Sequence, residues 1–164
     1  MTRRKTEEPL RRHWLMKSEP ECYGIRDLER DGKTGWDGVR NYQARNIMRD
    51  EIHVGDAVLI YHTNGTPPGV AGVARVCGSA RPDPSQWEPK SEHFDPKSTT
   101  EEPIWVLIDV EFVATFTHFV GLDALKSNPE LKGLMVTKKG QRLSIQPVSE
   151  EHFRVICKMG GLRA

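Results

Sequence analysis

The sequence predicts a single α+β domain, in which a small curled sheet or barrel carries short helices over its openings. Three observations lead to this prediction. Strand-forming stretches outnumber helical ones, the helical stretches are short, and irregular segments separate the strands. The 164 residues, of which 37% are hydrophobic, are enough for one core. No apolar run approaches the length that a bilayer requires, so we expect no membrane partner.

Two strands and one short helix are expected in the first part of the chain, besides the longer helix described next. Residues 13–17 and 57–61 are strongly apolar and predict strands. Residues 24–30 predict a short helix, because Ile25 and Leu28 lie three apart on one face. A turn at 31–33 follows that helix.

A longer helix is expected to begin after Asn41 and to run to about Glu51. Asparagine is a favourable N-cap, because its side chain accepts a hydrogen bond from the first turn. Ala44, Ile47 and Met48 keep helical spacing, so we expect them to face the core.

From residue 70 onward the sequence predicts strands and short helices. Residues 70–76, 104–116 and 140–148 predict strands, the second of them the longest in the chain. Residues 121–131 contain a short helix. A final helix is expected after Ser149, whose hydroxyl can cap it.

Residues 78–103 form the unusual segment. Its five prolines exclude regular structure across most of it; they are Pro82, Pro84, Pro89, Pro96 and Pro103. Trp87 and Phe94 favour an ordered flap over disorder. A loop of this length in a small domain is usually functional or disordered.

The stretch 36–46, Trp-Asp-Gly-Val-Arg-Asn-Tyr-Gln-Ala-Arg-Asn, carries most of the functional information. It combines a large aromatic ring, a glycine turn, side-chain amides and guanidiniums. Such groups can stack on a flat heteroaromatic ring and hydrogen-bond its edge. Acid–base chemistry would need carboxylates, His or Cys, and this stretch offers only Asp37. We therefore expect a protein that reads a base and does not break a bond.

Charge and cysteines add weaker information. The net charge is +1, but residues 1–12 are basic and read as a flexible arm without a secretory signal. A local basic face on a nearly neutral protein suits modest phosphate contact. The three cysteines, Cys22, Cys77 and Cys157, are far apart and form no C-x-x-C motif, so reduced structural cysteines in a cytosolic protein are expected.

Five motifs in order give the chain a resemblance to a known family. They are Trp14–Pro20 (WLMKSEP), the 36–46 stretch, Tyr61–Asn64 (YHTN), Phe94–Lys97 (FDPK) and Arg142–Val148 (RLSIQPV). Together they resemble the EVE domain, the family of the thymocyte nuclear protein and its small bacterial relatives. The resemblance covers about residues 13–158, so residues 13–164 are expected to form one EVE domain.

The resemblance implies a PUA-like mixed β-barrel with short flanking helices. It also implies binding of DNA or RNA that carries a modified base, since EVE domains are thought to do so. The family is distantly similar to YTH domains, which read methylated adenine in RNA. Lys17-Ser18 and the Trp36 region resemble the positions from which YTH domains build an aromatic cage. The sequence differs from YTH domains after Ser18 and after Trp36, so the preferred modification is not implied.

We expect one base, methylated or hydroxymethylated, to leave its stack and enter a pocket beside Trp36. Polar side chains around the pocket would read its edge. The expected pocket residues are Lys17, Ser18, Glu19, Trp36, Val39, Arg40, Asn41, Gln43, Tyr61, His62 and Asn64. The cations expected to contact flanking phosphates are Lys17, Arg40, Arg45 and Arg49.

Several of these residues have a structural alternative. Trp36 could fill the core, and Asn41 could serve only as a helix cap. Asn64 precedes a glycine, which is a turn signal. Arg45 and Arg49 could pair with neighbouring acids on the surface.

Two other functions remain open. A metal-dependent nuclease could use His62, Asp83, His93 and Asp95, although their spacing matches no metal signature. A protein-interaction module could instead present the proline-rich segment and Trp87. No cofactor is expected, and a monomer located in the cytoplasm, or in the nucleus of a eukaryote, is favoured. The sequence does not decide whether the ligand is DNA or RNA, and it does not identify the modification of the base.

Overall fold

A computed structural model describes residues 11–64 and 67–162. Six strands form one mixed sheet in the order β2-β5-β4-β3-β1-β6. They are β1 (His13–Ser18), β2 (Lys33–Trp36), β3 (Ala57–His62), β4 (Gly69–Pro82), β5 (Val106–Gly121) and β6 (Ile145–Val148). The α-helices are α1 (Ile25–Asp31), α2 (Tyr42–Asp50), α3 (Leu122–Ser127) and α4 (Glu150–Met159). Three short 3₁₀ helices complete the set: η1 (Pro84–Trp87), η2 (Pro129–Leu131) and η3 (Met135–Thr137).

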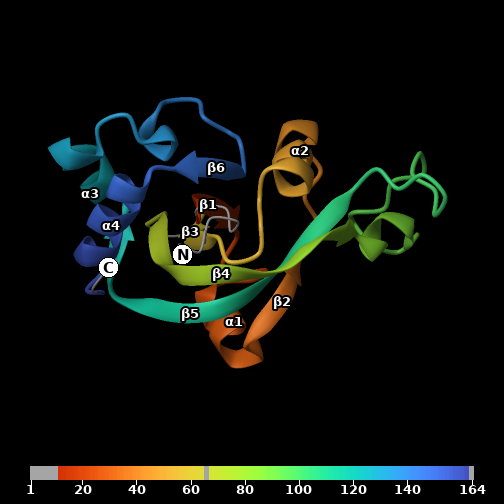
Figure 1. The fold of residues 1–164 in the computed structure, drawn as a ribbon, viewed down its shortest axis with the longest axis horizontal. Helices are drawn as coiled ribbons and strands as arrows, with labels where there is room; N and C mark the ends of the chain where they lie inside the picture. The colour runs from red at the N-terminus through yellow and green to blue at the C-terminus, as the bar shows by residue number, and fades with distance from the viewer. Residues whose placement is uncertain (1–10, 65–66, 163–164) are drawn as a thin grey trace, which may run out of the picture.

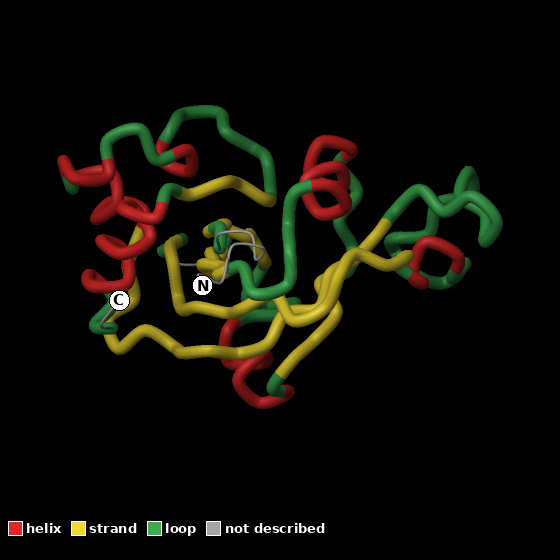
Figure 2. Tube along the Cα trace, in the orientation of Figure 1, coloured by secondary structure: helices red, strands yellow, loops and turns green. Residues whose placement is uncertain are grey.

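The antiparallel pair β4 and β5 runs along the length of the molecule (Figure 1). Its pairing extends from Gly69↔Gly121 at one end to Pro82↔Val106 at the other, with several register shifts that bend it. Beyond the second end, residues 83–105 form a separate projection, which we call the lobe. Figure 2 shows that the lobe is mostly loop with one helical turn.

Strands β1 and β3 are parallel neighbours in the sheet, and the chain between them contains α1, β2 and α2. Their register pairs Leu15 with Leu59 and Ser18 with His62. Because side chains alternate along a strand, Lys17 and Ser18 at the end of β1 point to opposite faces. This position lets the end of β1 reach two separate surfaces.

Strands β1 and β3 are buried on both faces of the sheet. Trp14 and Met16 pack into one core cluster with α1 and α2, and Leu15 packs into a second cluster with α3 and α4. The same alternation in β3 places Ile60 in the first cluster and Leu59 in the second. Burial on both sides explains why the strand sequences are almost continuously apolar.

The predicted α+β architecture is confirmed: the sheet is curled, and short helices flank it (Figure 1). The expected helix caps are also present. The Asn41 side chain accepts a hydrogen bond from the Ala44 amide, and the Ser149 hydroxyl accepts one from the His152 amide. Phe153 is buried on the inner face of α4.

Three predicted boundaries were wrong. The turn expected at 31–33 runs directly into β2, which the sequence analysis missed. The strand expected at 140–148 is confined to β6, because a turn with Gly140 at φ +77° precedes it. Regular structure also enters the proline-rich segment, since β4 continues to Pro82 and η1 follows.

The predicted basic arm falls largely on residues 1–10, which lie outside the described residues. At its other end Arg12 is tied to the domain. Its backbone amide donates to Asp56 Oδ1 at 3.1 Å, and its guanidinium carbon lies 4.4 Å from the centre of the Trp14 ring. Within the described part of the chain, no helix is long and apolar enough to cross a membrane.

Candidate nucleic-acid interface

A pocket of about 410 Å³ lies where the end of β1, strand β2 and the lobe meet. Ligand pockets commonly enclose about 300–1,000 Å³, so its size suits a single base or nucleoside. We call it the Trp36 pocket. Its lining residues are Lys17, Ser18, Glu19, Cys22, Tyr23, Thr34, Gly35, Trp36, Asp37 and His93.

Trp36 and Ser18 form the inner part of the Trp36 pocket. Trp36 is 8% exposed, so most of the indole belongs to the core and only a small part borders the pocket. Most of the Trp36 side chain therefore packs in the core, which was the structural alternative for this residue. The Ser18 hydroxyl is buried and has no hydrogen-bond partner among the residues that the structure describes. A hydroxyl that is buried without a hydrogen-bond partner has lost its hydrogen bonds to water, at a cost in free energy. A ligand with a complementary polar atom would recover that free energy.

The charges of the Trp36 pocket are mixed. Burial lowers the pKa of Lys17, whose ammonium donates to the Gln141 carbonyl at 3.2 Å. Burial, and then the negative charge of Asp83, raise the pKa of Asp37. Glu19 accepts hydrogen bonds from the Cys22 thiol and from the Asn64 amide, the second at 2.8 Å. With one lysine and two carboxylates, the pocket favours a neutral ligand that can donate hydrogen bonds.

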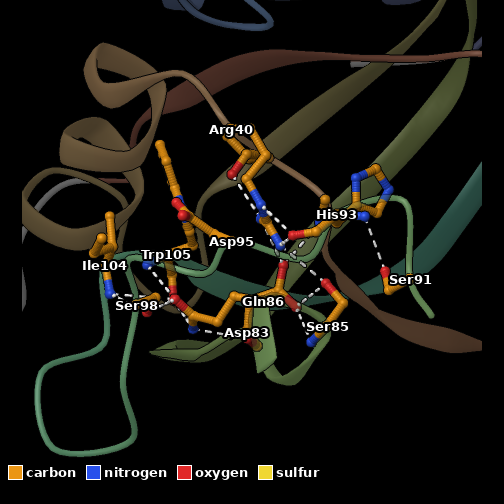
Figure 3. Close-up of polar contacts among 12 residues, drawn as sticks. Arg40, Asp83, Ser85, Gln86, Ser91, His93, Asp95, Ser98, Ile104 and Trp105 are labelled. Carbon is orange, nitrogen blue, oxygen red and sulfur yellow. Dashed lines mark hydrogen bonds and ion pairs between the residues drawn. The ribbon is translucent and has the colours of Figure 1, made fainter. Parts of the chain in front are cut away.

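Arg40 attaches the lobe to the rim of the Trp36 pocket (Figure 3). Its Nε and Nη2 atoms donate to the His93 carbonyl at 3.0 and 2.8 Å. The remaining N–H groups bond the Val39 carbonyl at 2.9 Å, Asp83 Oδ2 at 3.1 Å and Ser85 Oγ at 3.0 Å. All five N–H donors of the guanidinium are thus used within the protein.

Asp83 is the buried anion of this connection, with a fully buried side chain. It accepts hydrogen bonds from the Gly38 amide at 2.8 Å, from the Ser85 amide at 2.9 Å and from the Ser85 hydroxyl at 2.6 Å. Burial by itself would raise the pKa of Asp83. The hydrogen bonds from Ser85, Gly38 and Arg40 outweigh burial and lower that pKa, so the carboxylate stays charged.

Gly38 lets the His93 ring come close to the pocket rim. Its φ of +82° is a conformation that L-residues with side chains rarely adopt. A Cβ atom at this position would lie 2.8 Å from His93 Nε2. The glycine in the 36–46 stretch is therefore required for both the turn and the packing of the lobe.

The base of the lobe is closed by the fully buried side chain of Gln86 (Figure 3). Its amide nitrogen donates to the carbonyls of Asp83 and Trp105 at 2.7 and 2.8 Å. Its amide oxygen accepts from the Ser98 hydroxyl at 2.5 Å and from the Trp105 amide at 2.8 Å. The proline-rich segment is thus an ordered unit, as Trp87 and Phe94 suggested from the sequence.

The structure brings four of the eleven expected pocket residues together in the Trp36 pocket: Lys17, Ser18, Glu19 and Trp36. Tyr61 and Asn64 line a neighbouring hollow, which Lys17 also lines. Asn64 has φ +54°, which agrees with its turn signal.

The other five expected pocket residues do not line the Trp36 pocket, and four of them have a structural role. Val39 is buried in the core, Asn41 caps α2 and Arg40 holds the lobe. His62 Nε2 accepts a hydrogen bond from the Ile25 amide at 3.1 Å, which places the imidazole at the start of α1. Gln43 lies exposed on α2.

Two of the cations expected to contact phosphate are also occupied elsewhere. Arg45 donates to the Ile104 carbonyl at 2.9 Å and lies over the Tyr42 ring. Arg49 pairs with Asp50 at 2.8 Å, as its structural alternative predicted. Of the four expected cations, only Lys17 borders the Trp36 pocket.

Six lining residues of the Trp36 pocket were not expected from the sequence: Cys22, Tyr23, Thr34, Gly35, Asp37 and His93. Thr34 and Gly35 precede Trp36 on β2 and Asp37 directly follows that strand, so recognition of β2 would have indicated them. Cys22 and Tyr23 follow the Trp14–Pro20 motif after a single residue. His93 comes from the distant lobe, and no local pattern connects it to the pocket.

The nuclease hypothesis receives no geometric support. The described residues contain no group of three or more His, Cys, Asp or Glu side chains that could hold a metal ion. His62 accepts a backbone hydrogen bond, Asp83 pairs with Arg40, and Asp95 accepts a hydrogen bond from Trp105 Nε1 at 2.7 Å.

Comparison with known proteins agrees with the fold and with the resemblance. The model of the EVE domain family matches residues 12–159. Human thymocyte nuclear protein 1 is 39% identical over 166 residues, which cover 90% of this chain and 73% of that protein. A hypothetical protein from Leishmania major has a similar structure, with a TM-score of 0.88, 43% identity and coverage of 93% of this chain and 96% of that chain.

One similar structure contains nucleic acid. It is the crystal structure of human THYN1 protein in complex with 5-methylcytosine containing DNA. It matches with a TM-score of 0.84 and 38% identity, and the match covers 93% of this chain and 99% of that chain. The family model and the identity to these relatives extend over nearly the whole sequence. The chain belongs to the EVE domain family.

Proposed function

We propose that this chain binds nucleic acid that carries a modified base, with DNA containing 5-methylcytosine as the first candidate, and that the base enters the Trp36 pocket. The observation that carries the proposal is the buried Ser18 hydroxyl without a partner, in a pocket bordered by Trp36. The complex of a 38% identical relative with 5-methylcytosine containing DNA supports the choice of ligand. The name of the animal relatives fits a nuclear site of action if the chain comes from a eukaryote.

The polar groups of the Trp36 pocket suit the edge of a cytosine. Cytosine has an exocyclic amine that donates and ring atoms that accept hydrogen bonds. Glu19 and Asp37 supply carboxylate acceptors for the amine, and the Ser18 hydroxyl supplies a donor for a ring acceptor. The mixed charge of the lining also disfavours a phosphate here, so the pocket suits the base and not the backbone.

The gain from the modification itself should be modest. One methyl group placed against apolar surface contributes about 1 kcal/mol, which corresponds to a preference of a few-fold to tenfold over unmodified cytosine. Trp36 and Tyr23 provide aromatic surface on the pocket wall. Since Trp36 is mostly buried, we expect its contribution to lie at the lower end of the roughly 1–3 kcal/mol typical of base–aromatic stacking.

The test is a titration of labelled oligonucleotides followed by fluorescence anisotropy. Oligonucleotides with cytosine, 5-methylcytosine or 5-hydroxymethylcytosine are compared as single and double strands of DNA and as RNA. Ser18→Ala is the main variant, because its hydroxyl has no partner whose loss could disturb the fold. The loss of one hydrogen bond should weaken binding about two- to tenfold. Ser79→Ala, an exposed position on β4 that does not line the pocket, is the matched control.

Trp36→Leu provides a second variant, which should weaken binding and reduce the preference for the modified base. Its fold must be checked by circular dichroism, since Trp36 packs in the core. Affinity for every oligonucleotide equal to that of the parent protein, in both Ser18→Ala and a folded Trp36→Leu, would exclude the Trp36 pocket as the site.

A further inference from the structure

A second hollow of about 580 Å³ adjoins the Trp36 pocket and differs from it in charge. The turn at 138–142 forms much of its wall, and residues of β1, β3, α3, η3 and the segment between β3 and β4 also line it. We call it the basic hollow. Its five cations are Lys17, Lys126, Lys138, Lys139 and Arg142.

The positive charge of the basic hollow is not neutralised by the described residues. None of its described lining residues is a carboxylate. None of its five cations takes part in an ion pair with a described residue. Lys126, Lys138, Lys139 and Arg142 are exposed, so they can meet a ligand from solvent. Such a concentration of cations attracts phosphate.

Two features connect the basic hollow with the Trp36 pocket. Lys17 lines both of them. The hydrogen bond from Asn64 to Glu19 joins a residue of the basic hollow to a residue of the Trp36 pocket at 2.8 Å. A nucleotide whose base occupies the Trp36 pocket would therefore have its backbone close to the basic hollow.

The difference in charge divides the two parts of a nucleotide between the two sites. The Trp36 pocket contains Glu19 and Asp37 and would repel a phosphate. The basic hollow contains only cations and neutral groups among its described lining residues. The arginines expected from the sequence to contact phosphate are bonded within the protein, so the basic hollow offers a replacement for them.

We propose that the basic hollow binds the phosphates of the strand that flanks the nucleotide in the Trp36 pocket. Lys138, Lys139 and Arg142 contact these phosphates, and Lys17 lies at the junction between base and backbone. This inference rests on the proposed function, because the Trp36 pocket sets the position of the nucleotide. It adds the path of the backbone and assigns a role to the 138–142 turn.

The experiment measures the salt dependence of binding. The triple variant Lys138→Gln/Lys139→Gln/Arg142→Gln is compared with the parent protein between about 50 and 200 mM salt. Each lost contact with a single-stranded phosphate should reduce the slope of log K against log salt by about 0.7. The preference for 5-methylcytosine over cytosine should stay unchanged, because the Trp36 pocket is intact. The matched control is Lys90→Gln/Lys132→Gln, which changes two exposed lysines that line neither hollow.

A chemical change in the ligand tests the same contact from the other side. Oligonucleotides with neutral methylphosphonate linkages on both sides of the modified cytosine should bind the parent protein more weakly. The same substitution should cost the triple variant much less, since the cations that meet these phosphates are already absent. A melting temperature of the triple variant equal to that of the parent protein verifies that its fold is intact.

The outcomes separate this inference from the proposed function. The inference is overturned if the folded triple variant has the same salt slope as the parent protein and the methylphosphonates weaken the binding of both proteins equally. The base pocket would then stay in place. A reduced slope without any preference for a modified base would support the phosphate site and count against the proposed function.

Discussion

Replacement of Arg40 by methionine should destabilise the protein by about 3 kcal/mol. The Asp83 side chain is fully buried and the Arg40 side chain is 21% exposed. Removal of one partner from a buried ion pair typically costs about 3–5 kcal/mol, because the other charge stays buried. Asp83 would keep the hydrogen bonds from the Gly38 amide and from Ser85, so we expect the lower end of that range.

Urea denaturation followed by circular dichroism gives the free energy of unfolding for both proteins. Arg49→Met is the control, since it removes an exposed guanidinium whose pairing with Asp50 is screened by solvent and should leave the free energy of unfolding almost unchanged. If Arg40→Met unfolds within about 0.5 kcal/mol of the parent, the lobe connection does not contribute to stability as argued.

The same connection has a pH dependence with a definite sign. The pKa of Asp83 in the folded protein lies below its ordinary value of 3.8. Its contribution to stability is therefore complete above the unfolded pKa and is lost as the pH falls through the lower folded pKa. In Asp83→Asn, the free energy of unfolding should fall less steeply below about pH 5 than in the parent. Parallel curves for the two proteins would contradict the assigned charge of Asp83.

Two further predictions concern groups near the Trp36 pocket. Burial lowers the pKa of His62, whose Nε2 accepts a hydrogen bond from the Ile25 amide. The contribution of His62 to stability is therefore complete above pH 6.5 and is lost as the pH falls through its lowered folded pKa. The melting temperature of the parent protein should drop more between about pH 7 and pH 5 than that of His62→Gln, and equal drops would contradict this role. At mildly alkaline pH, iodoacetamide should modify exposed Cys22 and spare buried Cys157, whose pKa burial raises to about 11. A 5-methylcytosine oligonucleotide should slow the modification of Cys22 but not that of Cys77, which lies outside the pocket; an unchanged rate at Cys22, measured by mass spectrometry, would place the ligand elsewhere.

The elements with local signals could be predicted from the sequence. Asn41 and Ser149 cap their helices as expected, because N-capping depends on one side chain and the amides of the next turn. Strand β2 could not be predicted, since its four residues include Gly35 and follow a turn. It forms a strand because it pairs with β5, where Thr34 lies opposite Val110.

The pocket was predictable only in part, for a related reason. Ser18 and Trp36 belong to motifs that carry the family resemblance, so the sequence indicated both. Asn41 and Arg40 belong to the same stretch, but their hydrogen-bonding groups serve the helix and the lobe. His93 lies at the pocket because Arg40 binds its carbonyl and Gly38 leaves room for its ring, although Arg40 and His93 are 53 positions apart in sequence. Contacts of this kind depend on the tertiary fold and leave no periodic pattern.

The hydrogen bond between Ser98 and Ile104 makes residues 99–103 of the lobe a suitable place for an insertion. The Ile104 amide donates to the Ser98 hydroxyl at 3.0 Å and closes this exposed loop on itself. Loops closed at their base tolerate insertions, because the added chain costs little entropy and disturbs few contacts. An affinity tag or a fluorophore site inserted between Thr100 and Glu101 should therefore leave His93 in position. Such a label would report on ligand binding from outside the pocket.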